Sequence, residues 1–168
     1  MGYKGTMIYH RPKQKKIGIE SKTFPNLNEY LAAVPKHPLD NKDYKYLSIA
    51  EQYSRLSAPG NHRVGSVIVQ KNDIIGAGHN TTKTHPFQAK WNKYSNCLHA
   101  EMVALIDCMK LDDFQPDKST VYVSRYTRRS GMLGCSYPCK SCWNALSHVG
   151  IRKIVCYDET DRPVKLFV

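Results

Sequence analysis

Four residues of the chain have types and spacing that suit metal binding and proton transfer. His99 and Glu101 stand two apart in the stretch CLHAEMVAL, where an apolar run begins. Cys139 and Cys142 stand three apart in PCKSC, so a helix beginning there places both thiols on one face. One imidazole and two thiolates are a ligand set for a catalytic zinc ion, which keeps a fourth position for water. A carboxylate two residues from the histidine would lie close to that metal and could carry protons.

These residues also have interpretations that involve no catalysis. The two cysteines suit a structural zinc site or a redox dithiol, and Glu101 suits simple capping of a helix. Cys97 or Cys135 could add a fourth ligand and close the site to water. Neither a structural zinc nor a dithiol needs a glutamate beside the histidine, so we favour a catalytic zinc. Cys108 and Cys156 fall in apolar segments and are expected in the core.

Composition bounds the class of protein. A chain of 168 residues with 41% hydrophobic and 23% charged residues is typical of one globular domain. No apolar run approaches the roughly 20 residues of a membrane span, and no secretory signal is present, so we expect no membrane partner. Six cysteines in such a chain favour metal sites or free thiols in a reducing cytoplasm. The net charge of +11 favours phosphorylated or polyanionic partners, although solubility alone is an equally good explanation.

The pattern of residues predicts an α/β protein in which helices cover the faces of a sheet. Residues 1–43 read as a basic N-terminal arm, with several prolines and one short helix near 28–34, and residues 44–168 as the folded domain. Because few residues follow the strand at 151–158, a last strand at 164–168 should return as an antiparallel hairpin. The other expected elements are helices at 44–56, 98–110 and 139–149, strands at 63–70, 74–80 and 119–126, and loops at 81–96 and 127–138.

The two motifs together resemble the signature of the zinc-dependent cytidine and deoxycytidylate deaminase superfamily, H-x-E followed by P-C-x-x-C. His99-Ala100-Glu101 and the run from Pro138 to Cys142 match it, and the similarity extends from about Tyr44 to Tyr157. The resemblance implies a three-layer α/β/α sandwich with a mixed five-stranded sheet. The expected C-terminal hairpin is similar to that of the free-nucleoside cytidine deaminases, whereas deoxycytidylate and tRNA-editing enzymes carry a parallel fifth strand.

The resemblance also implies an activity and a set of roles. A zinc-bound hydroxide would attack C4 of cytosine or C6 of adenine, and Glu101 would pass protons to the ring nitrogen and the leaving amine. The backbone near Ala100 and Pro138 would contact the base. Asn80 aligns with an asparagine that contacts the sugar or base in many members, and Ser136 with a position that is often serine.

Two further groups of residues are candidates for substrate contacts. The stretch GHNTTKTHP resembles phage and bacterial deoxycytidylate-deaminase-like proteins, which suggests His85 as a pocket residue. Arg125 and Tyr126 end a predicted strand and are followed by Arg128 and Arg129. We expect this cluster near the pocket mouth, where Arg125 could clamp a 5′-phosphate and Tyr126 could stack on the base, unless the cluster is only a solvated loop.

The sequence therefore predicts a zinc-dependent hydrolytic deaminase of a cytosine nucleotide or nucleoside, with dCMP to dUMP as the first expectation. One alternative is a cytosine or adenine deaminase of RNA or single-stranded DNA, bound through the basic arm; another is a non-catalytic zinc-binding module. The resemblance adds a homo-oligomer of unspecified size. The base, the phosphorylation state of the substrate and any allosteric nucleotide stay open.

Overall fold

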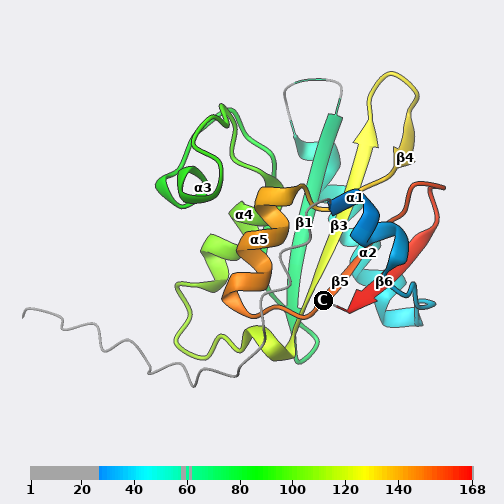
Figure 1. The fold of residues 1–168 in the computed structure, drawn as a ribbon, viewed down its shortest axis with the longest axis horizontal. Helices are drawn as coiled ribbons and strands as arrows, with labels where there is room; N and C mark the ends of the chain where they lie inside the picture. The colour runs from blue at the N-terminus through cyan, green and yellow to red at the C-terminus, as the bar shows by residue number, and fades with distance from the viewer. Residues whose placement is uncertain (1–26, 58–59, 61, 168) are drawn as a thin grey trace, which may run out of the picture.

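Six strands form one mixed sheet in the part of the chain that the computed structural model describes, residues 27–57, 60 and 62–167 (Figure 1). The order is β2-β1-β3-β5-β6, and β4 pairs with β3. The basic run at 11–16 and most of the predicted arm lie outside the described residues. The strands are β1 (His62–Gln70), β2 (Asp73–His79), β3 (Ser119–Thr127), β4 (Met132–Gly134), β5 (Lys153–Tyr157) and β6 (Pro163–Phe167).

The sheet has one strand more than the five that the sequence predicted. The additional strand is β4, which lies inside the predicted loop 127–138 and pairs antiparallel with the end of β3. It is three residues long, too short for an alternating pattern of apolar and polar residues to reveal it. The predicted C-terminal hairpin is present, because β5 pairs parallel with β3 and antiparallel with β6.

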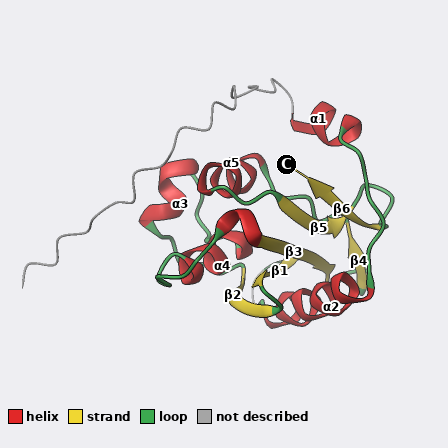
Figure 2. Ribbon diagram, turned by 90° about the horizontal axis from the view of Figure 1, so that it is seen from below, coloured by secondary structure: helices red, strands yellow, loops and turns green. Residues whose placement is uncertain are grey.

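Helices cover both faces of the sheet and make the three layers that were expected (Figure 2). One face carries α2 alone, and the other carries α1, α3, α4 and α5. The loop predicted at 81–96 contains a short helix of its own, α3. None of the described helices is long and apolar enough to cross a membrane. The helices are α1 (Leu27–Ala33), α2 (Asn41–Leu56), α3 (Pro86–Trp91), α4 (Ala100–Cys108) and α5 (Lys140–Val149).

The alternation of side chains along β1 divides the core into two halves. Val67 and Val69 pack on the α2 side with Leu47, whereas Ile68 packs on the other side with Met102 of α4. The backbone of α2 lies directly on the sheet at Gly65, where an added Cβ would come 2.1 Å from the carbonyl oxygen of Ala50 and 2.3 Å from the amide nitrogen of Ser54. The frame that carries the site is therefore packed closely on both faces.

Residues 27–43 contact the domain, although the predicted boundary at residue 43 stays a prediction. Leu31 is buried in the core, and the ring of Tyr30 lies edge-on to Trp143 of α5 at 5.5 Å between centroids. Helix α2 begins at Asn41, earlier than predicted, because Asp40 and Asp43 form a capping box at its start.

Candidate active site

His99, Cys139 and Cys142 come together at the first turns of two helices. His99 is the N-cap of α4, Cys139 is the N-cap of α5, and Cys142 lies in the first turn of α5. The Sγ atoms of Cys139 and Cys142 lie 3.4 and 3.3 Å from Nδ1 of His99. Ligand atoms of a tetrahedral zinc ion lie about 3.5 Å apart, given Zn–S and Zn–N bonds near 2.3 and 2.0 Å. The three side chains therefore fit zinc in both donor type and spacing.

The cluster has three members, as a catalytic zinc site requires. Among the described residues, His99, Cys139 and Cys142 form the group of His, Cys, Asp or Glu side chains whose ligand atoms all lie within 4.8 Å of one another. Neither Cys97 nor Cys135 joins it, although both line the adjoining cavity. The fourth position is thus left to a non-protein ligand.

The helix starts and the neighbouring groups favour one thiolate in this cluster. The pKa of Cys139 is lowered to about 3, chiefly because Cys142 donates a hydrogen bond to its sulfur, with further help from His99 and Ser141. The same bond, together with burial, raises the pKa of Cys142 well above its usual value. The Cys139 thiolate also raises the pKa of His99 to about 9. A metal must displace these protons, so its affinity should fall as the pH decreases.

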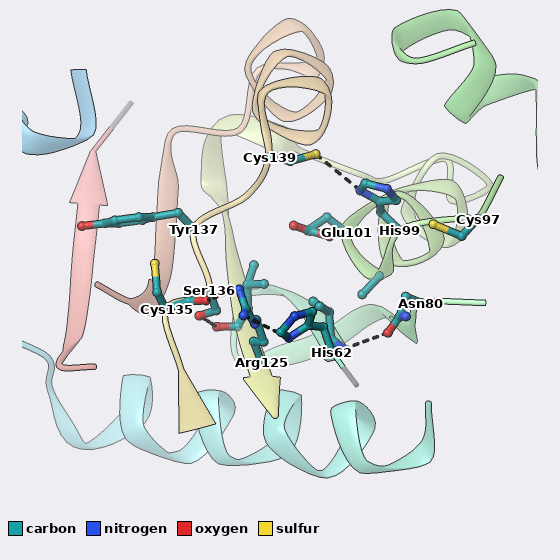
Figure 3. A pocket seen from close by; sticks show the side chains of 13 residues that line it. His62, Asn80, Cys97, His99, Glu101, Arg125, Cys135, Ser136, Tyr137 and Cys139 are labelled. Atoms are coloured by element: carbon teal, nitrogen blue, oxygen red, sulfur yellow. Dashed lines mark hydrogen bonds between the residues drawn. The ribbon is translucent and has the colours of Figure 1, made fainter. Parts of the chain in front are cut away.

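Glu101 is the second residue of α4, and its side chain lies in the same region (Figure 3). It is 5% exposed. Burial, and next the negative charge of Cys139, raises its pKa to about 6. A carboxyl group with a pKa near neutrality can both accept and release a proton at physiological pH, which suits the proton carrier predicted from the sequence.

A cavity of about 250 Å³ opens beside the cluster and brings several of the predicted residues together (Figure 3). Its wall combines residues from β1, β3, the start of α4 and the segment before α5. The lining includes Asn80, His99, Ala100, Glu101, Arg125, Ser136 and Cys139 of the predicted set, together with His62, Val64, Cys97, Val123, Cys135 and Tyr137.

Asn80 is held in place by its amide oxygen. Its Oδ1 accepts hydrogen bonds from the backbone N–H of Val64 at 2.8 Å and from the hydroxyl of Ser57 at 2.7 Å. Its side-chain nitrogen has no partner among the described residues. The amide NH₂ of Asn80 is therefore the group available to a ligand in the cavity.

Ser136 and Pro138 lie in the segment between β4 and α5. The Ser136 hydroxyl donates to the carbonyl of Val123 at 2.8 Å and accepts from the N–H of Tyr157 at 2.9 Å. This side chain thus joins β3 to β5. Because its hydroxyl proton is donated to the Val123 carbonyl, Ser136 has no side-chain hydrogen left to donate to a ligand. Pro138 lines a neighbouring hollow between α1 and the start of α5 rather than the cavity itself.

Arg125 and Tyr126 point to opposite faces of the sheet. Adjacent residues of a strand alternate in direction, so only Arg125 reaches the cavity. The Tyr126 ring lies on the α2 side of the sheet, where Cζ of Arg55 is 4.4 Å from the centroid of the ring. His85 is the N-cap of α3, where its Nδ1 accepts from the N–H of Phe87 at 3.1 Å, and it does not line the cavity.

Several residues that the fold brings to the site were not predicted from the sequence. His62 and Tyr137 line the cavity, and Gln88 and Ser95 contact His99 from the segment that was predicted as a loop. No local pattern singled out Gln88 or His62, because each reaches the site through pairing or packing of distant segments.

Comparison with known proteins identifies the family. The model of the cytidine and deoxycytidylate deaminase zinc-binding region matches residues 40–158. The chain belongs to this family of zinc-dependent hydrolases, and its cluster of His99, Cys139 and Cys142 could hold the metal ion. No curated protein matches the sequence.

Solved structures with the same fold include two deaminases. The dCMP deaminase from the cyanophage S-TIM5, in apo form, is 24% identical, with a TM-score of 0.54 over 73% of this chain and 88% of that one. A cytidine deaminase from Burkholderia pseudomallei is 18% identical, with a TM-score of 0.55 over 77% of this chain and 93% of that one. At these identities the likeness concerns the fold.

Proposed function

We propose that the protein hydrolyses the exocyclic amine of a cytosine nucleotide, with dCMP converted to dUMP. The observation that carries this proposal is the buried carboxyl of Glu101, which lines one small cavity together with two members of the metal-binding cluster. A structural zinc site has no need of a carboxyl group in that place.

The residues of this chain divide the work between them. His99, Cys139 and Cys142 would hold a zinc ion, which supplies an activated water for hydrolysis near neutral pH. The carboxylate of Glu101 would take one proton from that water and pass it to the ring nitrogen, and would then carry the second proton, from the hydroxyl added to the ring carbon, to the leaving amine. Proton transfer at these atoms is helped by the pKa of Glu101, which burial raises to about 6.

The cavity wall orients the substrate. The amide NH₂ of Asn80, fixed through its oxygen, can donate to an oxygen of the sugar or base. Ala100, fully buried at the start of α4, presents backbone rather than a bulky side chain. Val64 and Val123 give the cavity an apolar floor, which excludes water around the reacting ring.

A deaminase of RNA or single-stranded DNA is the alternative that the charge of +11 favours. Activity confined to a cytosine-containing or adenine-containing oligonucleotide, and lost with rising salt, would support it. The proposal also includes a homo-oligomer and a cytoplasmic location. Light scattering of the purified protein tests the oligomeric state, and fractionation of cells tests the location.

The test is turnover by the purified, zinc-loaded protein. We expect uracil products from dCMP, and the same assay with dCTP, CMP and deoxycytidine gives the range of substrates. Glu101→Gln is the control: it should keep zinc and lose about 10²- to 10⁴-fold in rate, because proton transfer is removed. No turnover of any cytosine compound would refute the proposal, and unchanged turnover in Glu101→Gln would refute the mechanism.

A further inference from the structure

Arg125 and His62 form a pair on the cavity wall, across from His99 and Cys139 (Figure 3). Nη2–H of Arg125 donates a hydrogen bond to Nδ1 of His62 at 3.0 Å. The pairing of β1 with β3 explains why they meet. Val64 lies opposite Arg125, and His62 is two residues before Val64, so all three side chains point to the same face.

The positive charge of Arg125 is not neutralised within the described structure. Its two hydrogen-bond acceptors are uncharged: the ring of His62, and the carbonyl oxygen of Cys135 at 3.5 Å from Nη1. Its Nε–H is buried and has no hydrogen-bond partner among the described residues. None of the ion pairs among the described residues includes Arg125. Because only neutral groups bind this guanidinium, its positive charge is available to pair with an anionic ligand in the cavity.

The depth of the two ends of the cavity indicates which part of a ligand meets this pair. Glu101 is 5% exposed at the inner end, whereas His62 is exposed and marks the mouth. A substrate whose base reaches Glu101 would place its most polar, charged part at the mouth, where water can still solvate it. A planar guanidinium there matches the oxygens of a phosphoryl group.

We propose that Arg125, positioned by His62, binds a phosphoryl group of the substrate and makes the enzyme select nucleotides over nucleosides. The inference rests on the proposed deaminase function and adds the group that the enzyme recognises besides the base. The phosphoryl group is either the terminal phosphate of a mononucleotide or a phosphodiester of a short strand, and the two sources are separated by the substrates below.

The experiment compares kcat/KM for dCMP, deoxycytidine and a cytosine-containing trinucleotide in the full-length zinc-loaded protein. In Arg125→Gln we expect the value for the phosphorylated substrate to fall about 10- to 100-fold, as for loss of a charged hydrogen bond, with that for deoxycytidine changed less than about threefold. Preference for dCMP or for the trinucleotide in the wild type identifies the source of the phosphate. Arg128→Gln is the matched control, because it removes the same charge from an exposed position of the same hairpin and should leave the ratio unchanged.

His62 is tested as a positioning residue. His62→Phe should lower the preference for the phosphorylated substrate, and His62→Asn should restore it, because the asparagine oxygen can accept the bond from Arg125. Circular dichroism melts establish that each variant is folded.

The outcomes separate this inference from the proposed function. Equal losses on deoxycytidine and dCMP in Arg125→Gln, equal effects of Arg125→Gln and Arg128→Gln, or a wild type that prefers deoxycytidine would each overturn the subsite while leaving deamination intact. If the protein turns over no cytosine compound, calorimetry with dCMP and with inorganic phosphate still tests the subsite. Binding that is lost in Arg125→Gln but kept in Arg128→Gln supports it, and no binding to the wild type refutes it.

Discussion

The side-chain oxygen Oε1 of Gln88 accepts a hydrogen bond from the backbone N–H of His99, with 3.2 Å between oxygen and nitrogen. Gln88 lies in α3 and is 1% exposed. On the other side of the histidine, the hydroxyl of Ser95 lies 3.5 Å from Nε2 of its ring. The N–H of an N-cap residue has no partner within its helix, so Gln88 supplies one. The segment 81–96 thus contacts both the backbone and the ring of His99, the predicted zinc ligand.

Loss of the Gln88 bond should weaken zinc binding. Gln88→Met keeps the size of the side chain but removes the acceptor, and we expect zinc affinity to fall about 10- to 100-fold, as for other residues that orient a metal ligand. Competition with a chromophoric chelator measures it. Gln88→Glu retains an acceptor oxygen and should lose less. Zinc affinity in Gln88→Met equal to that of the wild type would show that Gln88 only packs.

The four cysteines around the cavity should differ in their effect on zinc content. Cys139→Ser and Cys142→Ser remove ligands that converge on His99, so each should abolish stoichiometric zinc as measured by atomic absorption. Cys97→Ser and Cys135→Ser are the controls, because both thiols line the cavity but lie outside the cluster. If either control lost its zinc, the site would have a fourth protein ligand and our catalytic interpretation would fail.

Gly65 should tolerate no side chain. Gly65→Ala places a methyl group against the backbone of α2, 2.1 Å from the Ala50 oxygen, so helix and strand must move apart. We expect a loss of about 1 to 3 kcal/mol in the free energy of unfolding, measured by urea denaturation. Gly134→Ala is the comparison, because the nearest atom to its added Cβ is 3.8 Å away. Equal effects of the two substitutions would contradict the close approach of α2.

The turn between β5 and β6 should give the protein acid sensitivity through Asp158. Burial alone would raise the pKa of this carboxyl, but hydrogen bonds from the Thr160 hydroxyl and from the N–H groups of Thr160 and Arg162 hold it below its usual value. The folded state therefore binds a proton less readily than the unfolded chain. The stabilisation is present above about pH 4 and is lost as the pH falls through the lowered pKa.

Asp158→Asn should consequently be less stable than the wild type at pH 7, by about 2 kcal/mol, because bonds to a charged acceptor are replaced. The difference should narrow towards pH 3, which denaturation at several pH values would detect. Asp112→Asn, an exposed carboxylate elsewhere, should show no such narrowing. A difference that stays constant with pH would mean that the charge of Asp158 is not what stabilises the turn.

The metal cluster was predictable because its members sit in local motifs. His99 and Cys139 each precede an apolar helix, so their short motifs were enough to predict that both lie at helix starts. The structure places them there and brings them together. The order of elements was predictable for a similar reason, since α2, α4 and α5 have apolar residues at helical spacing and β1, β2 and β3 are short runs rich in apolar residues. Strand β4 and the short helix α3 are below the length at which a period can be recognised.

The residues around the cluster were harder to predict, because they depend on register and tertiary packing. His62 meets Arg125 only through the pairing of two strands, and Gln88 meets His99 only through the docking of α3. The proposal that Tyr126 stacks on the base overlooked a rule that the sequence does contain. Neighbours in a strand face opposite sides, so Arg125 and Tyr126 were never suited to share one pocket.

Strand β3 divides one of its edges between two partners, with β5 beside residues 120–122 and β4 beside residues 125–127. The pairing that holds the hairpin joins residues 125–127 to residues 132–134, and the pairing of β3 with β1 and β5 does not include the tip at residues 128–131. Residues 128–131 can therefore be replaced without removing any of these strand pairs. The length and sequence of this tip can be exchanged in chimeras while the metal-binding cluster stays on a frame whose strand pairing does not include the exchanged residues.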